Sequence, residues 1–262
     1  TTNPSRLRRT PFVWSLYLVV ALFSFMLSMI GPMAPRLREE FGMSYGLAGL
    51  HQSAFAAGMV VMGLAGGGLM RRLGFAVSAW GGVAGMIAGL VGMTLSRGPA
   101  GTLSSIFAMS LAGTMALSAA QAAFADWPRE LRGKLVLESN MAASAFAMLV
   151  PIVLLAGDAV GLGWRVVLPA MVVASLGAAI VGLPSARSRA RDSAARAAEA
   201  ETGGRLGASF WRAWLVVFLG VSVEWALSFW CMTYLLGLPG ASTGLASRSE
   251  EHTSELQSPN TI

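Results

Sequence analysis

Residues 12–31 read FVWSLYLVVALFSFMLSMIG, a run of twenty residues without a charge. A helix needs about 20 mostly apolar residues to cross the hydrocarbon core of a bilayer, so this stretch predicts a membrane-spanning helix. The whole chain of 262 residues has the same character, with 55% hydrophobic and 12% charged residues and a mean hydropathy of +0.61. Soluble domains carry about 25% charged residues, so the composition predicts a membrane protein.

Six further apolar blocks of similar length follow the first one. Only helices and closed barrels satisfy the backbone polar groups in lipid, and continuous rather than alternating apolar runs favour helices. The predicted spans are 12–31, 50–70, 75–95, 103–125, 135–157, 164–183 and 210–236. The predicted fold class is therefore an all-α membrane protein.

Basic residues gather on one side of these spans. With the N-terminus placed in the cytoplasm, fourteen Lys and Arg residues fall on the cytoplasmic side and four on the other, leaving out Arg248. This positive-inside bias predicts a multi-pass protein of the cytoplasmic (inner) membrane with a cytoplasmic N-terminus. The net charge of +6 also suits nucleic acid, but short basic clusters between apolar blocks favour a lipid surface. We therefore expect no nucleic-acid partner.

Motifs that would indicate an enzyme or a metal protein are scarce. The one cysteine, Cys231, lies inside a predicted span, which excludes an intrachain disulfide and a cysteine-based metal site. The sequence has no His-Glu-x-x-His motif and no phosphate-binding Gly-Lys-Ser/Thr loop. We expect a protein that is not an enzyme and that holds no cofactor or metal. An intramembrane enzyme and a non-transporting membrane scaffold are the alternatives.

Several connections resemble those of one family. Residues 125–134 read ADWPRELRGK and resemble the fourth-to-fifth helix loop of major facilitator superfamily (MFS) transporters. GWR at 163–165 and EWALSFWCMTYLLG at 224–237 are similar to segments of the same family. The resemblance covers about 12–247. It implies a cytoplasmic N-terminus at 1–11, an N-terminal six-helix bundle at 12–183, a cytoplasmic linker at 184–209 and the start of a C-terminal bundle at 210–247.

The last residues differ in character from the rest. Residues 248–258 read RSEEHTSELQS, which resembles the translation of a sequencing-library adapter, so we interpret 248–262 as a non-native tail. We expect the chain to be a truncated piece of a longer protein, inactive by itself and monomeric when complete.

The resemblance also implies a function. MFS proteins are secondary active transporters in which two bundles rock around a midplane site, giving a small solute access to each side in turn. The few charges in the predicted cavity favour a neutral or weakly acidic organic solute. Val150-Pro151 stands where antiporter branches of the family have a Gly-Pro motif, so antiport is not favoured.

One carboxylate lies in the middle of an apolar run, at Glu224 in VVFLGVSVEWALSFW (216–230). An acid at the bilayer centre costs roughly 2.5–3.5 kcal/mol, so intramembrane acids are usually kept for function. Ser228 and Cys231 share its helical face. The resemblance places this face on the central cavity, where a protonatable carboxyl would couple transport to protons. A hydrogen bond to a neighbouring helix is the structural alternative.

A polar stripe follows one face of the predicted fourth helix, and a shorter one follows the first helix. The first stripe has spacings of four, four and three, so its members share a face. Together with Glu224 and Ser228 these stripes give the predicted substrate and proton pathway: Gln121, Ser118 and Thr114, with Ser110 next to them, and Ser24 and Ser28. Ser and Thr in spanning helices also bond to their own backbone carbonyls, which is the structural alternative.

Two cytoplasmic connections are predicted to gate the transporter. In the first, Arg71 stands where the family usually has Asp, and two arginines that anchor a helix end at the lipid surface are the simpler interpretation. In the second, the family pattern implies a charge network. The predicted gating residues are Gly67, Arg71, Arg72 and Gly74 in the first loop, and Asp126, Arg129, Glu130 and Arg132 in the second.

Three smaller features complete the predictions. His51 is expected to lie at the membrane interface, and the charged residues at 36–40 are expected to be simply solvated. Gly81, Gly85 and Gly89 are spaced by four, which predicts a small-residue ridge for close contact between helices.

Overall fold

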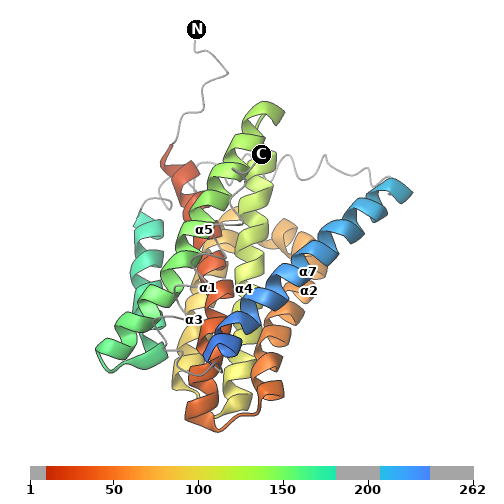
Figure 1. Cartoon of the computed structure of the whole chain (residues 1–262). Helices are drawn as coiled ribbons and strands as arrows, with labels where there is room; N and C mark the ends of the chain where they lie inside the picture. The colour runs from red at the N-terminus through yellow and green to blue at the C-terminus, as the bar shows by residue number, and fades with distance from the viewer. Residues whose placement is uncertain (1–9, 181–206, 237–262) are drawn as a thin grey trace. The chain divides into compact units, whose positions relative to one another are not determined.

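The computed structural model describes residues 10–180 and 207–236 of the chain. The described residues form long helices and no strand, which confirms the all-α prediction (Figure 1). The chain divides into two compact units, Thr1–Ala197 and Ala198–Ile262, and the division falls inside the predicted linker. The predicted non-native tail and most of the predicted linker lie outside the described residues.

The described residues of the first unit form six helices that follow the predicted spans. They are α1 (Pro11–Phe41), α2 (Tyr45–Ala76), α3 (Gly82–Leu95), α4 (Pro99–Ala125), α5 (Arg129–Ala159) and a sixth helix over 167–180. A π-helical turn, η1 (Val77–Gly81), joins α2 to α3, and a 3-10 turn, η2 (Gly163–Val166), precedes the sixth helix. The second unit contains α7 (Ala208–Leu236), which confirms the helix predicted at 210–236.

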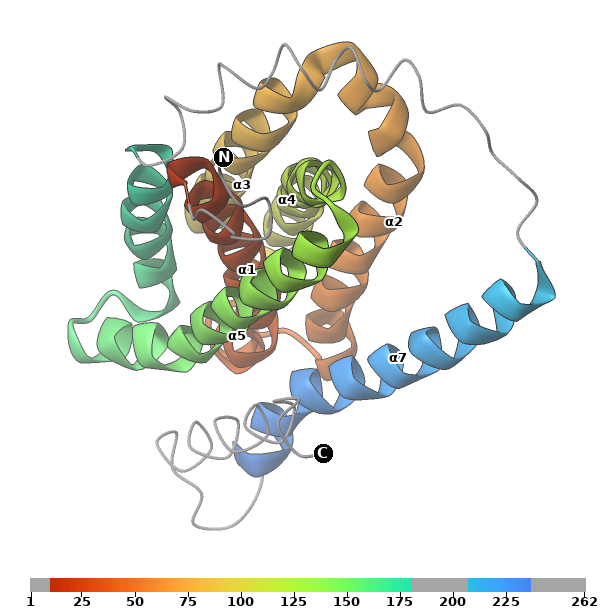
Figure 2. The same cartoon turned by 90° about the horizontal axis from the view of Figure 1, so that it is seen from above.

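Five helical stretches of the described residues are long and apolar enough to cross a membrane: Pro11–Phe41, Tyr45–Leu95, Pro99–Ala125, Arg129–Ala159 and Gly163–Ile180. The second stretch has 51 residues and contains two predicted spans. Gly74 separates them, because its φ of 77° and ψ of 167° are not helical. A positive φ suits glycine, which lacks a Cβ. Figure 2 shows the curved path by which the chain passes from α2 into α3.

Local sequence signals determine where several helices begin and end. We call the end of the bundle that holds the connections 42–44, 96–98 and 160–162 the distal end. Gly42 ends α1 in the left-handed conformation with a φ of 61°, and the Ser44 side chain caps α2 by accepting from the Leu47 amide at 3.2 Å. Pro99 begins α4, where its missing N–H costs nothing. The proximal end holds the Gly74 kink and the connection 126–128.

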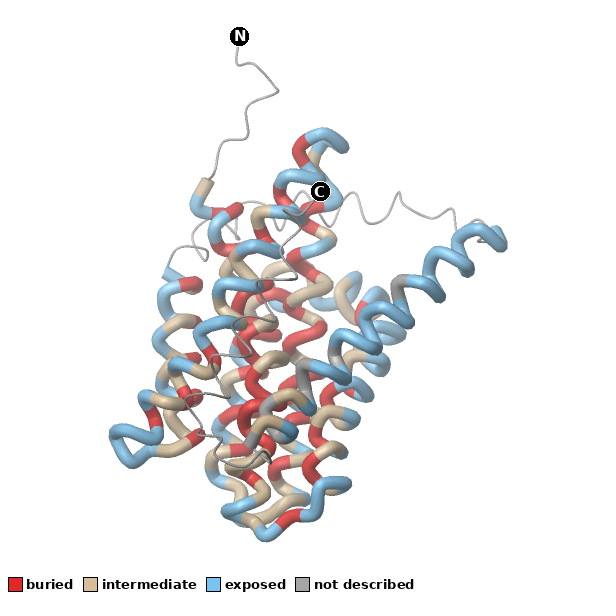
Figure 3. The backbone as a smooth tube through the Cα atoms, viewed as in Figure 1, coloured by how far each residue is buried: buried red, intermediate tan, exposed pale blue. Residues whose placement is uncertain are grey.

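Helix packing places α1 and α4 at the centre of the bundle. α1 packs mainly against α5, whereas α4 packs against both α2 and α3 and also contacts α1. Nineteen of the 31 residues of α1 are buried. Figure 3 shows the buried positions concentrated on the inner helix faces. Lipid gives little hydrophobic driving force between helices, so close van der Waals packing must hold them together.

A glycine ridge on α3 provides this close packing against α4. A Cβ added at Gly82 would lie 2.6 Å from the Ala112 carbonyl oxygen, and one at Gly89 would lie 2.7 Å from the Met109 Cβ. Gly85 and Gly92 make similar contacts with α4. The predicted ridge is therefore confirmed in kind but wrong at Gly81, whose Cβ would meet only Val77 of its own segment, at 3.7 Å.

Two neighbouring glycines test this packing directly. We expect Gly82→Ala to lower the unfolding temperature, because its methyl group would force α3 from the α4 backbone, and overpacking costs about 1–3 kcal/mol. Gly81→Ala is the matched control, since it gives the same gain in helix propensity without the contact with α4. Circular dichroism in detergent measures both. A Gly82→Ala protein as stable as Gly81→Ala would contradict the close-contact interpretation.

Candidate functional site

α1 has a single open stripe along its central part. Between residues 19 and 34 every residue is buried except Ser24, Leu27 and Ser28, which are half-buried. The two predicted pathway serines therefore lie on the only side of this helix segment that the first unit leaves open. The one-turn spacing of Ser24 and Ser28 indicated the shared face but not its exposure.

The polar stripe of α4 divides into a packed part and an open part. Ser110 is fully buried and donates a hydrogen bond to the Phe55 carbonyl of α2 at 2.5 Å. Thr114 is also buried, and its hydroxyl has no hydrogen-bond partner within the described residues. Ser118 is half-buried and Gln121 is exposed. Ser110 thus serves helix packing, whereas the side chains of Ser118 and Gln121 remain accessible from outside the packed interface.

The open residues of the two stripes lie on neighbouring helices. α1 and α4 contact each other, and Phe23 of α1 lies close to Gly113 of α4, where an added Cβ would be 2.9 Å from its ring. Among the described residues no hydrogen bond joins the serines of α1 to the polar side chains of α4. The structure therefore places the stripes on adjacent helices without linking them directly.

The remaining predicted pathway residues belong to the second unit. Glu224 lies in α7 and its side chain is exposed. The side chain of Ser228 lies outside the described residues. A pathway that combines α7 with α1 and α4 stays a prediction.

An acid that the sequence interpretation missed lies in α5. Glu138 is half-buried, and the Tyr17 hydroxyl of α1 donates a hydrogen bond to its Oε2 at 2.7 Å. Tyr17 is only 3% exposed and lies two helical turns from Ser24, so it shares the face of the two serines. An acid inside a predicted span was the available signal. It passed unnoticed because it follows the basic residues that begin α5.

The hydrogen bond between Tyr17 and Glu138 gives a second test. We expect Tyr17→Phe to weaken the packing of α1 on α5 by about 1 kcal/mol, because one hydrogen bond to a half-buried acceptor is lost. Tyr45→Phe is the control, since Tyr45 is exposed and its ring would still stack with Arg38. Denaturant titration followed by tryptophan fluorescence measures the difference. Equal stability of the two variants would show that the contact contributes nothing.

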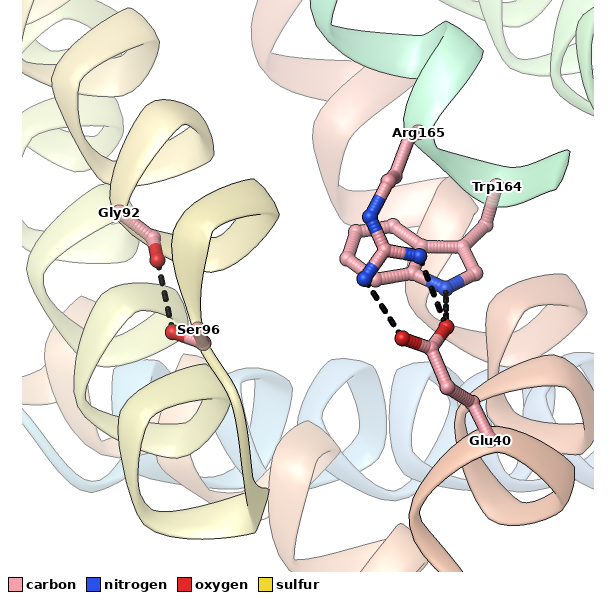
Figure 4. A network of polar contacts seen from close by, with 5 residues as sticks. All are labelled: Glu40, Gly92, Ser96, Trp164 and Arg165. Atoms are coloured by element: carbon pink, nitrogen blue, oxygen red, sulfur yellow. Dashed lines mark hydrogen bonds and ion pairs between the residues drawn. The ribbon is translucent and has the colours of Figure 1, made fainter. Parts of the chain in front are cut away.

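A cluster of charged residues ties α1 to the α5–η2 corner at the distal end. The Glu40 carboxylate accepts from the Trp164 indole at 2.7 Å and from both terminal nitrogens of Arg165, at 2.9 and 2.5 Å (Figure 4). Arg36 makes a second ion pair with Asp158, also at 2.5 Å. The expectation that residues 36–40 are only solvated is therefore wrong for Arg36 and Glu40. Their partners come from more than a hundred residues away, which no local pattern indicates.

His51 is buried between two helices near the distal end of α2. It is only 1% exposed, and it lies between α2 and α4 with a polar contact at each ring nitrogen. Its partner on α4, Thr102, is distant in sequence, so the sequence did not indicate this contact, and the interfacial position stays a prediction.

The first predicted gating loop contains a break in the helical backbone. Gly74 has the positive φ described above, whereas Gly67 is exposed with open space around it. Arg71 and Arg72 are exposed near the kink, and the structure shows no ion pair for either among the described residues. This arrangement suits lipid-surface anchoring and leaves the gating role a prediction.

The second predicted gating loop uses one arginine for capping. Arg132 donates to the Ala125 carbonyl at 2.6 Å, which satisfies an unpaired carbonyl at the end of α4. Asp126, Arg129 and Glu130 are exposed, and no ion pair within the described ranges joins them to one another or to Arg132. The charge network stays a prediction.

These features define a multi-pass helical membrane protein with a partly polar open face. The family model of the Major Facilitator Superfamily matches residues 16–247. The chain belongs to the Major Facilitator Superfamily, a family of transporters, which confirms the resemblance stated above.

Solved structures agree with this assignment at the level of the fold. One is the crystal structure of a mutant of the peptide transporter POT, with a TM-score of 0.57, 16% sequence identity and coverage of 83% of this chain and 46% of that chain. The same mutant in complex with sulfate gives a TM-score of 0.56, 17% identity and coverage of 89% and 48%. The chain thus spans less than half the length of either transporter. No curated protein matches the sequence significantly.

Proposed function

We propose that the complete protein is a secondary active transporter that moves a small organic solute by alternating access. The observation that carries this proposal is the open stripe of α1, where Ser24 and Ser28 interrupt an otherwise buried helix segment. Polar groups that face away from their own bundle in a membrane protein need a polar neighbour or water. A solute pathway between two bundles supplies both.

The chemistry of the open residues suggests the solute class. Ser24, Ser28 and Ser118 offer hydroxyl groups, and Gln121 offers an amide that both donates and accepts. None of these groups carries a charge, and the nearby acid Glu138 already accepts a hydrogen bond from Tyr17. We therefore propose a neutral or weakly acidic organic solute rather than a multiply charged one. Thr114, with its unpartnered buried hydroxyl, lies between the packed and open parts of this set.

Proton coupling is the second part of the proposal. Glu224 interrupts the apolar sequence of α7 with a carboxyl group that can hold a proton. It would then carry a proton together with the solute, with Ser228 one turn away.

We further propose that the protein is monomeric, lies in the cytoplasmic membrane with its N-terminus in the cytoplasm, and uses the loops at 67–74 and 126–132 as gates.

Transport is tested with the uninterrupted gene product in proteoliposomes. A panel of neutral and weakly acidic solutes is added, and an internal pH-sensitive dye reports solute-driven proton entry. We expect Gln121→Ala to slow flux about tenfold, because losing about 1.4 kcal/mol of hydrogen bonding weakens solute binding by that factor. Gln52→Ala, on α2, is the control. Residues 1–262 alone should give no flux, and absence of flux for every solute with the complete protein would favour a scaffold.

The proton role of Glu224 has its own test in the same vesicles. We expect Glu224→Gln to transport solute without moving protons and to lose the acceleration that an inward proton gradient gives, because the amide cannot titrate. Glu39→Gln removes an exposed acid of the distal loop and serves as the control. A Glu224→Gln protein with unchanged pH dependence would remove this residue from the coupling mechanism.

A further inference from the structure

The buried histidine between α2 and α4 has an unusual set of partners. His51 is the seventh residue of α2, and its Nδ1 lies 3.0 Å from the Leu47 carbonyl oxygen. Its Nε2 lies 2.8 Å from the hydroxyl oxygen of Thr102 in α4. Thr102 is fully buried, and its hydroxyl also lies 3.0 Å from the Pro99 carbonyl oxygen.

These three contacts cannot all be hydrogen bonds while the imidazole is neutral. The Leu47 and Pro99 carbonyls only accept, so Nδ1 must carry a hydrogen, and a bond to Pro99 uses the one hydrogen of the Thr102 hydroxyl. The hydroxyl oxygen then only accepts, which requires a second hydrogen on Nε2. The complete set of contacts therefore belongs to the doubly protonated imidazolium.

A neutral His51 keeps two of the three contacts. Nδ1 still donates to Leu47, while the Thr102 hydroxyl turns its hydrogen from Pro99 toward Nε2. The two protonation states thus differ by one proton and by the rotation of one hydroxyl hydrogen, without movement of a heavy atom. A buried histidine whose second nitrogen faced only apolar groups would instead leave its added N–H unsatisfied.

No charged side chain of the surrounding helices takes the place of these hydrogen bonds in stabilising the imidazolium. α3 and α4 carry no charged residue, and the charges of α2, Arg71 and Arg72, lie at its proximal end. Near the distal end, Arg97 is exposed in the connection to α4, and the charges of α1 are those at 36–40, where Glu40 is bound by Arg165. On these elements only hydrogen bonds stabilise a charged imidazole, because α2, α3 and α4 contain no acidic residue.

We propose that His51 is a proton-binding site of the first unit, in which the Thr102 hydroxyl reverses its hydrogen bond to hold the imidazolium inside the α2–α4 interface. Proton uptake there strengthens the link between the two helices, because the bond from Nε2 to Thr102 becomes charge-assisted, while the third hydrogen bond, from Thr102 to Pro99, forms within α4. This site is separate from the proposed role of Glu224, and its existence does not depend on transport.

Nitrogen NMR of labelled histidine tests the proposal in phosphatidylcholine nanodiscs. For this measurement the protein is prepared with the substitution His252→Gln, so that His51 is its one remaining histidine. We expect the Nδ1–H tautomer at mildly basic pH and protonation of both nitrogens at acid pH, with unchanged helical circular dichroism. A neutral Nε2–H tautomer, or a ring that stays neutral until the helices unfold, would overturn the proposal.

Two substitutions of Thr102 separate the hydroxyl from side-chain shape. Thr102→Val keeps the branched shape but cannot accept, so we expect its titration midpoint to fall by about one pH unit. Thr102→Ser keeps the hydroxyl and should titrate as the unmodified chain does. An unchanged midpoint in Thr102→Val would overturn the proposal. If this variant does not fold, the tautomer of neutral His51 measured with Thr102 intact still tests the proposal. Failure of solute flux would not alter these spectra, so the two hypotheses fail independently.

Discussion

The bundle depends on how closely α2 and α3 approach α4. A Cβ at Gly58 of α2 would lie 2.7 Å from the Ser110 Cβ and 2.9 Å from the Phe107 carbonyl oxygen, and the α3 ridge makes equally short contacts. Because lipid does not drive helices together as water does, contacts at this distance supply the dispersion energy that association requires. α4 thereby becomes the element that two other helices share.

The polar residues of α4 have different uses along its length. Toward the distal end, Thr102 and Ser110 bond to groups of α2, so their hydroxyls belong to the packed interface. Toward the proximal end, Ser118 and Gln121 are open. A single helix therefore combines a half whose polar groups are used in packing with a half whose polar groups are open, and the boundary falls near Thr114.

α1 is fastened to the other half of the bundle near both of its ends. Tyr17 bonds to Glu138 of α5 toward the start of the helix, and Glu40 binds the η2 segment at its end. The ion pair between Glu40 and Arg165 is half exposed, so it contributes only modestly to the free energy of unfolding. The value of these two contacts lies in fixing the direction of α1, and a bundle held at both ends suits rigid-body rocking, the motion that the proposed transport requires.

The sequence by itself determined the class of the fold, because apolar length is a local property and lipid allows few solutions for the backbone. It also placed the boundary between two spans at 71–74 and the helix faces of Ser24 and Gln121, since these depend on apolar length and helical period alone. Only the tertiary structure decided which polar side chains are consumed in packing. Ser110, His51 and Glu40 find their partners on other helical elements, 51 to 125 residues away, and the energy of a buried polar group depends on that partner rather than on its own identity.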